Sequence, residues 1–244
     1  MRTLLTFVLT FITFQVWTQE LFNAYKEKDL TKIETLIKNG TDPNQLNKDG
    51  VTVMFLAASD NNIEVGKILL KYGGKVDMSI GKCETKPLLI ACQENSYEFV
   101  KFIVENGGDV NTKNKCAGNQ APIRFACKTG SVKLVTYLLD NGANLEDTPD
   151  DQITPIVQAA RSNHYDLVKF LIAKGANVNA YAATHDKECA LNQAIMNKNS
   201  DIVELLLENG ALVTFTDDKG NSSLKLAKKS KIKKIIELVE SKTK

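Results

Sequence analysis

Six glycines divide most of this chain into segments of nearly equal length. Each ends a run with apolar side chains at helical spacing, as Leu167, Val168, Leu171 and Ile172 do before Gly175. Helices commonly end at glycine because it adopts positive φ without a Cβ penalty. The steps between successive glycines are 33, 34, 35, 33 and 35 residues, which predicts a stack of supersecondary repeats. These glycines are Gly40, Gly73, Gly107, Gly142, Gly175 and Gly210.

An alanine stands sixteen residues before each of these glycines. That interval never varies, whereas the interval from a glycine to the next alanine ranges from 17 to 19 residues. The constant interval therefore predicts a rigid pair of helices, and the variable one contains a surface loop. Pro87, Pro122 and Pro155 mark the first position of the first helix in three copies, and Thr154 is a candidate N-cap. The alanines are Ala24, Ala57, Ala91, Ala126, Ala159 and Ala194, with Ala227 in a final copy.

The fifth copy carries the residues that identify the repeat. Thr154-Pro155-Ile156-Val157-Gln158-Ala159 is followed, after two helices, by Gly175-Ala176-Asn177-Val178-Asn179. This pattern resembles the ankyrin repeat. The resemblance runs from Leu21 to about Val239. It implies an all-α repeat solenoid of about seven stacked helix-turn-helix units with β-hairpin fingers. We expect one domain over 20–244, with repeats near 20–50, 51–84, 85–119, 120–152, 153–187 and 188–220 and a capping repeat over 221–244.

The polar tail after each glycine is expected to turn the chain into a finger, with a valine packed beneath it. Those valines are Val76, Val110 and Val178. The chain departs from the family where a histidine usually occupies the first helix, so the hydrogen bonds that this histidine makes between repeats are left open. The residues at that position are Phe55, Leu89, Arg124, Val157, Asn192 and Lys225.

The N-terminus has the layout of a secretory signal peptide. Arg2 precedes an apolar segment from Thr3 to Trp17, which is short for a membrane span. We expect a signal peptide over 1–19, cleaved after Thr18 or Gln19, and an exported protein that is periplasmic or secreted. An uncleaved membrane anchor is the alternative. No later run is long and apolar enough to span a membrane, and the net charge of +2 steers the chain toward neither nucleic acid nor membranes.

Five cysteines are an odd number for an oxidising compartment. Cys92 and Cys127 occupy equivalent sites in neighbouring first helices, which pack farther apart than a disulfide spans, so we expect buried free thiols. Cys83 and Cys116 lie 10 and 9 residues past their glycines in adjacent fingers, and we predict a bridge between them. Cys189 then stays free or pairs between molecules.

The sequence gives little support for catalytic or metal-binding activity. Of two histidines, His164 is expected to be structural, and His185 lies in a long finger with no nucleophile beside it. The acidic run over 146–151 lacks the spacing of a calcium loop and is interpreted as a solvated finger. The C-terminal lysines are interpreted as a polar cap, with a patch for anionic surfaces as the alternative. We expect no enzyme activity, cofactor or metal. Asn39 and Asn221 are glycosylation acceptors only in a eukaryotic secretory pathway.

The resemblance implies that the protein binds another protein through a concave surface of fingers and first-helix ends, acting as a monomer. We expect a partner of mixed charge, because the row of helix ends runs from acidic Asp60 and Glu94 to basic Lys128 and Arg161. A periplasmic accessory to an exported enzyme and a secreted effector or toxin-neutralising protein remain open, and an enzyme or metal site is disfavoured. The helix-end candidates are Ser59, Asp60, Gln93, Glu94, Lys128, Thr129, Arg161 and Ser162, and the finger candidates are Lys82, Thr85, Gln120, Asp151, Tyr181, His185 and Asp186.

Overall fold

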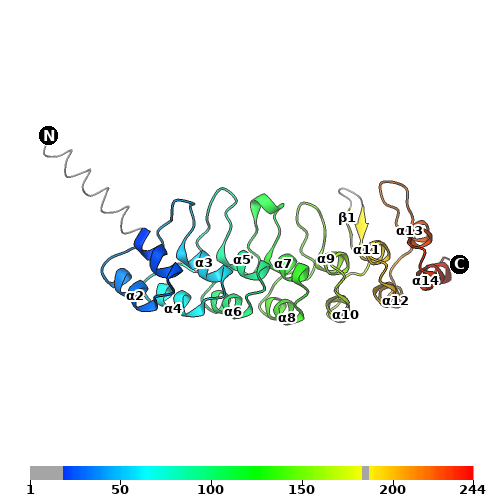
Figure 1. Cartoon of the computed structure of the whole chain (residues 1–244). Helices are drawn as coiled ribbons and strands as arrows, with labels where there is room; N and C mark the ends of the chain where they lie inside the picture. The colour runs from blue at the N-terminus through cyan, green and yellow to red at the C-terminus, as the bar shows by residue number, and fades with distance from the viewer. Residues whose placement is uncertain (1–18, 183–186, 244) are drawn as a thin grey trace. The chain divides into compact units, whose positions relative to one another are not determined.

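The computed structural model describes residues 19–182 and 187–243. The apolar segment of the predicted signal peptide lies outside them. The chain forms two compact units that divide between Asp109 and Val110. Both consist of paired helices joined by fingers, so the predicted ankyrin-type helical solenoid is confirmed (Figure 1). Within the described residues, no helix has both the length and the apolarity to cross a bilayer. The predicted repeat boundaries stay a prediction.

In unit one, the described residues form three helix pairs. Residues 19–26 are helical and precede α2 (Leu30–Lys38). The next pairs are α3 (Val53–Ser59) with α4 (Ile63–Lys71), and α5 (Pro87–Gln93) with α6 (Tyr97–Glu105). The finger before α5 closes through an antiparallel bridge between Ile80 and Thr85.

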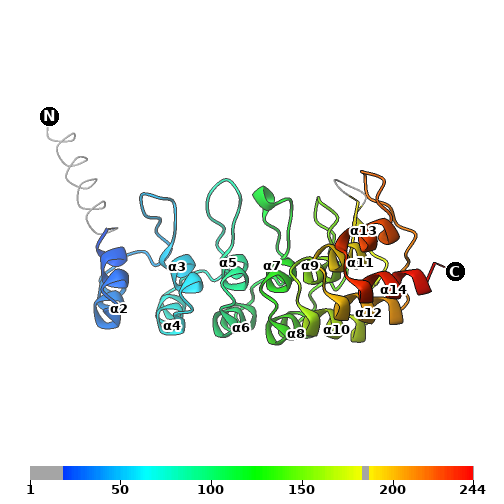
Figure 2. The ribbon, with the colours of Figure 1, turned by 45° about the vertical axis from the view of Figure 1, so that its right-hand side comes forward.

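Over its described residues, unit two has four helix pairs in two layers (Figures 1 and 2). The first helices, which lie next to the fingers, are α7 (Pro122–Thr129), α9 (Pro155–Arg161), α11 (Ala190–Met196) and α13 (Ser223–Ser230). The second helices are α8 (Val132–Asp140), α10 (Tyr165–Ala173), α12 (Ser200–Glu208) and α14 (Lys233–Ser241). One finger carries the short helix η1 (Lys115–Ala117), and another pairs β1 (Tyr181–Ala182) with β2 (Glu188–Cys189) in antiparallel register.

The helix boundaries fall where local chemistry predicts them. Proline occupies the first turn of α5, α7 and α9. All six repeat glycines have φ between 86° and 101°. After α10, Gly175 and Ala176 donate their N–H groups to Ile172 and Leu171, which is the Schellman pattern of a helix end. The predicted N-cap Thr154 differs, because its side chain makes no capping hydrogen bond and its Oγ1 is buried with no hydrogen-bond partner among the described residues.

The repeat alanines form the centre of the core, and all seven are fully buried. Their burial agrees with the predicted position between the two helices of each pair. On α10 the buried stripe is narrower than predicted, because Leu167, Val168 and Leu171 are buried whereas Ile172 is half-buried. The valines beneath the fingers also differ from one another. Val76 and Val110 are buried, but Val178 is only half-buried.

The polar tail has a role beyond turning the chain. Asn111, four residues after its glycine, donates from Nδ2 to the Gly142 carbonyl (2.9 Å) and accepts at Oδ1 from the Asn144 N–H (3.0 Å). Asn44 and Asn179 bind the following helix end in the same way. These carboxamides pair backbone groups that a helix end leaves unsatisfied, and they thereby join neighbouring repeats.

Gly66 stands where the other copies have valine or isoleucine. A Cβ there would lie 3.0 Å from the rings of Phe99 and Phe102, which pack against each other edge to face. Replacement of Gly66 by valine, although it matches the other repeats, should lower the free energy of unfolding by about 1–3 kcal/mol through overpacking. Urea denaturation measures the change. Equal or higher stability of the variant would show that the two rings leave room beside α4.

Candidate protein-binding surface

One position of the first helices recurs on the finger-side layer of each unit, two residues after the core alanine. Ser59 and Gln93 occupy it in unit one. In unit two it holds Lys128, Arg161, Met196 and Lys229, which are all exposed. Met196 was not among the candidates predicted from the sequence, although its repeat position could have identified it. A methionine that is 51% exposed in this row adds an apolar contact between cations.

The unit-one candidates are partly engaged within the protein. Asp60 accepts a hydrogen bond from the Tyr25 hydroxyl (2.6 Å), and burial, followed by this bond, raises the pKa of Tyr25. Exposed Gln93 donates to exposed Glu94 (3.3 Å). Lys82 is exposed at the tip of its finger, and Thr85 forms the bridge that closes that finger. Lys82 and the α5 end therefore remain the accessible candidates of this unit.

In unit two the family's histidine position holds a buried arginine. The Arg124 Nε donates to Gln158 Oε1 (2.7 Å), and Nη1 donates to the Ile153 carbonyl (3.0 Å). Both terminal nitrogens reach the Asp151 carboxylate, at 2.9 and 3.0 Å. Arg124 thus joins α7, α9 and the finger between α8 and α9. At this position, the ion pair links neighbouring repeats in place of the hydrogen bonds that the family's histidine makes.

The interpretation of residues 146–151 as a solvated finger is only partly right, because Asp150 is exposed but Asp147 and Asp151 are paired with cations of the neighbouring repeat. The Asp147 side chain is only 6% exposed and forms an ion pair with Lys113. Asp151 forms an ion pair with Arg124, so its carboxylate stabilises the fold in the absence of a partner. Burial raises the pKa of Asp151, but the hydrogen bonds from Arg124 and the Ile153 N–H, together with the Arg124 charge, outweigh burial and lower it. The acids of this run hold the finger in place because neighbouring repeats supply cations that sequence spacing did not reveal.

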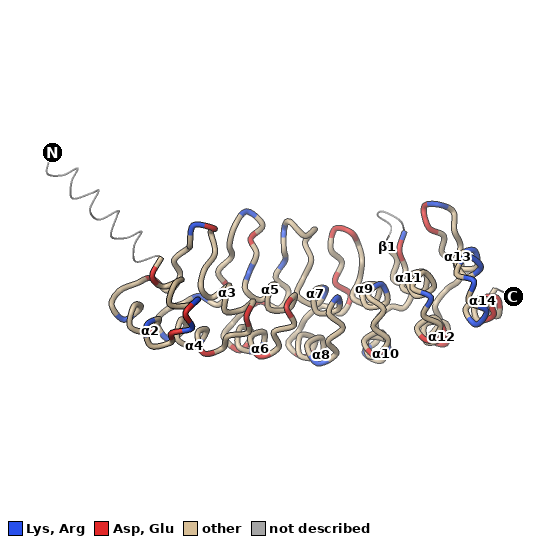
Figure 3. Tube along the Cα trace, viewed as in Figure 1, with Lys and Arg blue, Asp and Glu red and all other residues tan. Residues whose placement is uncertain are grey.

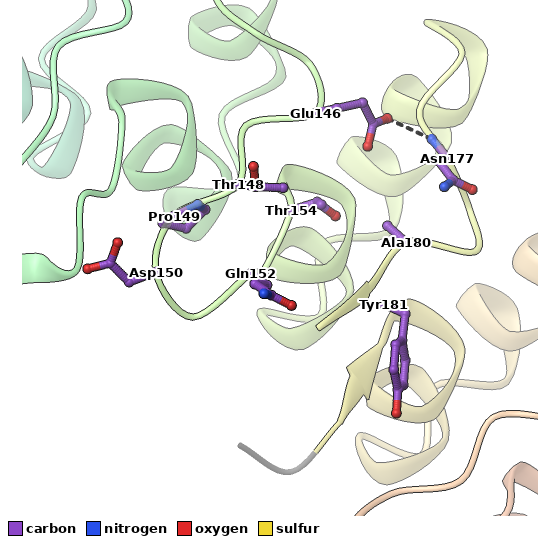
Figure 4. A pocket seen from close by; sticks show the side chains of 9 residues that line it. All are labelled: Glu146, Thr148, Pro149, Asp150, Gln152, Thr154, Asn177, Ala180 and Tyr181. Carbon is purple, nitrogen blue, oxygen red and sulfur yellow. Dashed lines mark hydrogen bonds between the residues drawn. The ribbon is translucent and has the colours of Figure 1, made fainter. Parts of the chain in front are cut away.

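Glu146 and Asp150 of the same finger are among the residues that line an open groove of about 490 Å³ in unit two, and the Asp150 carboxylate points away from it, toward the preceding finger (Figure 4). Glu146 accepts a hydrogen bond from the Asn177 N–H (2.8 Å), and Asp150 accepts one from Asn119 Nδ2 (2.9 Å). The groove is lined by no lysine or arginine among the described residues. In Figure 3 this finger, between α8 and α9, is predominantly acidic. The groove therefore favours a polar or cationic segment of a partner.

Tyr181 lines the far side of the groove, where its ring stacks on Phe215 with 4.8 Å between centroids. Two of the predicted finger candidates, His185 and Asp186, lie outside the described residues. Among the described residues, Tyr181 with Phe215 supplies the aromatic surface of this face.

The other unit-two candidates are either held by hydrogen bonds within the protein or exposed to solvent. The Thr129 hydroxyl donates to the Ala126 carbonyl (2.9 Å), and the Ser162 hydroxyl accepts from Gln158 (2.8 Å). Gln120 pairs with Asn114 at the base of its finger. Arg161 is exposed and lies 3.5 Å from Glu188. Lys128 is exposed, and no ion pair is found for it among the described side chains. Lys128 and Arg161 are thus the accessible charges among the helix-end candidates predicted for unit two.

His164 is structural, as predicted. Its Nε2 lies 3.0 Å from the Lys128 carbonyl, and its ring lies so close to Gly130 that a Cβ there would approach to 2.5 Å. In the part of the chain that the structure describes, no group of three or more His, Cys, Asp or Glu side chains could hold a metal ion.

The lysines of the last repeat contact side chains of their own unit. Lys234 pairs with Asp201 and Glu204, Lys228 pairs with Glu240, and Lys229 donates to Asn221. These contacts favour the capping interpretation over a free basic patch.

Three cysteines, Cys92, Cys127 and Cys189, are buried free thiols. Burial raises the pKa of each one, which keeps the thiols protonated and unreactive. The two first-helix thiols match the prediction, and the burial of Cys189 opposes a bridge between molecules. Cys83 lies in a finger of unit one and Cys116 in η1 of unit two, and their pairing stays a prediction.

Stacked helix pairs that present fingers and helix ends define a repeat scaffold for binding. A family model described as ankyrin repeats in three copies matches residues 21–114 and 112–182. The chain therefore belongs to the ankyrin-repeat family. It is also similar to the crystal structure of the human ASB11 ankyrin repeat domain, with a TM-score of 0.77 and 25% identity over 91% of this chain and 96% of that one.

Curated relatives are longer than this chain. It is 29% identical over 245 residues to the ankyrin repeat and KH domain-containing protein mask-1 of Caenorhabditis elegans, covering 85% of this chain and 9% of that protein. It is 36% identical over 197 residues to human palmitoyltransferase ZDHHC17, covering 80% of this chain and 31% of that protein. The chain thus spans a minor part of both relatives. What it shares with them is the repeat, a fold that typically acts as a non-enzymatic binding scaffold.

Proposed function

We propose that this protein binds a protein partner, without enzyme activity, through the finger-side face of unit two. The observation that carries the proposal is the placement of two charge types on that face. Lys128 and Arg161 are exposed on the first helices, and the groove beside them is lined by Glu146 and Asp150. A partner segment with both charge signs complements such a face. Met196 and the stacked Tyr181 supply the apolar contact that interface centres use.

Reversal of a groove charge tests the proposal. Asp150 is exposed and is one of the residues that line the groove, so lysine there replaces a negative charge at its edge and should repel a cationic partner segment. We expect Asp150→Lys to weaken partner capture at least about tenfold, or about 1.4 kcal/mol. Asp166→Lys, on the exposed side of α10, is the matched control and should capture normally. Quantitative pull-down from the native fraction measures both. Equal capture by the wild type and Asp150→Lys would exclude the groove.

We propose further that the protein is exported and serves as an accessory to an exported enzyme. The charged start and apolar segment of its N-terminus support export. The buried, unreactive thiols Cys92, Cys127 and Cys189 are compatible with an oxidising compartment. A secreted effector or toxin-neutralising protein is the alternative, and fractionation separates the two, because the effector would leave the producing cell.

Mass spectrometry of the native protein tests export and the Cys83–Cys116 bridge together. Cleavage should occur after Thr18 or Gln19. A non-reducing peptide map should show Cys83 joined to Cys116, and alkylation of the folded protein should leave the three buried thiols unmodified. An intact Met1 on a cytoplasmic species would exclude export. Alkylation of both Cys83 and Cys116 in freshly isolated exported protein would exclude the bridge.

A further inference from the structure

One exposed position repeats across the four first helices of unit two. It lies two residues after the buried alanine of each helix and holds Lys128, Arg161, Met196 and Lys229, all exposed. Their helices, α7, α9, α11 and α13, contact one another in this order (Figures 1 and 2). The four side chains therefore form one row across unit two, which we call the helix-end row.

The cations of the helix-end row keep hydrogen-bond donors for a ligand. Arg161 lies 3.5 Å from Glu188, and Lys229 donates to Asn221 (2.7 Å). A guanidinium has five N–H donors and an ammonium group has three, so both retain donors beyond these contacts. The Arg161 side chain is 48% exposed and that of Glu188 only 14%, so this ion pair presents mainly its cation to solvent. The row therefore favours an acidic segment of a partner.

The spacing of the repeats selects the conformation of that segment. Packed helices lie about 8–10 Å apart, so the three steps of the helix-end row cover about 24–30 Å. A polyproline II helix completes one turn in three residues and about 9 Å, so its every third side chain points to the same side. Three such turns cover about 28 Å, which matches the row.

The other regular conformations match the row less well. A β-strand places side chains on one face about 7 Å apart, which falls short of the first step. An α-helix returns to the same face after seven residues and about 10.5 Å, so three steps cover about 31 Å and exceed the row.

The apolar side chains of this face also suit a proline-rich segment. Phe125 is half-buried and lies three residues before Lys128 on α7, so the two are neighbours on the helix surface. Met196, which is 51% exposed, occupies the third position of the row. Polyproline II segments dock on aromatic and apolar surfaces because their backbone loses little entropy on binding.

We propose that the helix-end row binds an acidic segment of the partner in the polyproline II conformation. Carboxylates three residues apart pair with Lys128 and Arg161, an apolar side chain three residues further contacts Met196, and a last carboxylate pairs with Lys229. The segment runs along the row in one of its two directions. This inference rests on the proposed function, because it specifies the acidic part of the mixed-charge segment.

Fluorescence anisotropy of labelled synthetic peptides with the full chain tests the spacing. The probes EPPEPPLPPE and EPPLPPEPPE carry the pattern in the two directions. The control EPEPLPEPPP has the same composition but different spacing, and an alanine-based helical peptide carries the same side chains every seven residues, in both directions. We expect one of the first two probes to bind saturably, with a dissociation constant at least about tenfold below those of the control and the helical peptides. Absence of saturable binding by both probes, or equal or tighter binding of the control or a helical peptide, would overturn the proposal.

Charge variants test whether the peptide lies on the helix-end row. Lys229→Glu should raise the dissociation constant of the tighter probe at least about tenfold. Lys169→Glu, on the exposed side of α10, makes the same change of charge and should leave it within about twofold. Equal losses in the two variants would contradict the assignment to the row.

A gain of binding checks the register without relying on a loss. Met196→Lys should bind a probe with glutamate in place of leucine at least about tenfold more tightly than the wild type does. Circular dichroism confirms that each variant is folded. No gain in the folded variant would show that the third contact of the segment does not lie at Met196.

Failure of this inference is distinguishable from failure of the proposed function. Failure of both period-three probes, together with weakened partner capture by Asp150→Lys, removes the acidic polyproline II segment and leaves the finger-side face. Normal partner capture by Asp150→Lys and by charge-reversed Lys128 and Arg161 removes the proposed function, whatever the peptides do.

Discussion

Replacement of Arg124 by methionine is expected to lower the free energy of unfolding by about 2–4 kcal/mol. Methionine fills a similar volume but leaves the Asp151 carboxylate, Gln158 Oε1 and the Ile153 carbonyl without the donor that all three share. The estimate stays below the range for a fully buried pair, because the Asp151 side chain is 35% exposed and can regain water. Lys128→Met, on the exposed side of the same helix, should change stability by less than about 0.5 kcal/mol.

The pH dependence of Arg124→Met provides an independent check. The folded pKa of Asp151 lies below its usual 3.8, so its pairing contributes stability above pH 3.8 that is lost as the pH falls through the folded pKa. The difference in unfolding free energy between the wild type and Arg124→Met should therefore narrow on acidification below pH 3.8. Urea denaturation at a series of pH values measures it. A difference that stays constant or widens would show that the ion pair does not stabilise this unit.

Reversal of Lys128 and Arg161, two exposed cations of the helix-end row, should have the largest effect on binding. Lys128→Glu with Arg161→Glu places two acids beside the acidic finger and removes the cations that a mixed-charge partner would contact. We expect partner affinity to fall by about 2–3 kcal/mol, or roughly 30- to 150-fold, with helical circular dichroism unchanged. Calorimetry or surface plasmon resonance with the captured partner measures it.

A matched control reverses two exposed lysines of the second helices, Lys133→Glu with Lys169→Glu. It changes the net charge equally and should bind as the wild type does. Comparable losses in both double variants would indicate a nonspecific charge effect and not a binding face.

Much of the fold could be predicted because the residues that begin and end each helix act locally. Gly175 ends α10 through its own positive φ, and Pro155 starts α9 through its own ring, so neither needs a distant partner. The spacing from Ala159 to Gly175 then gives the helix pair.

The site was less predictable because it depends on contacts between repeats. Arg124 meets Asp151 only because stacking brings α7 beneath the next finger, so the acidic run by itself indicated a solvated finger. The close contact that a Cβ at position 66 would make is set by two rings of the following repeat. The recurring polar tail marked Asn111 as a repeated feature. Its hydrogen-bond partners, Gly142 and Asn144, lie 31 and 33 residues away, so the sequence did not identify them.

Site-specific photo-cross-linking tests the central claim most directly, because it maps the binding face without altering its charge pattern broadly. A photoreactive amino acid is placed at Lys128 or Gln152 on the finger side, or at Lys133 or Lys169 on the second helices; all four residues are exposed. The account predicts that one protein partner in the native fraction is cross-linked from positions 128 and 152 and not from 133 or 169. Cross-links to that partner from the second helices alone would contradict it.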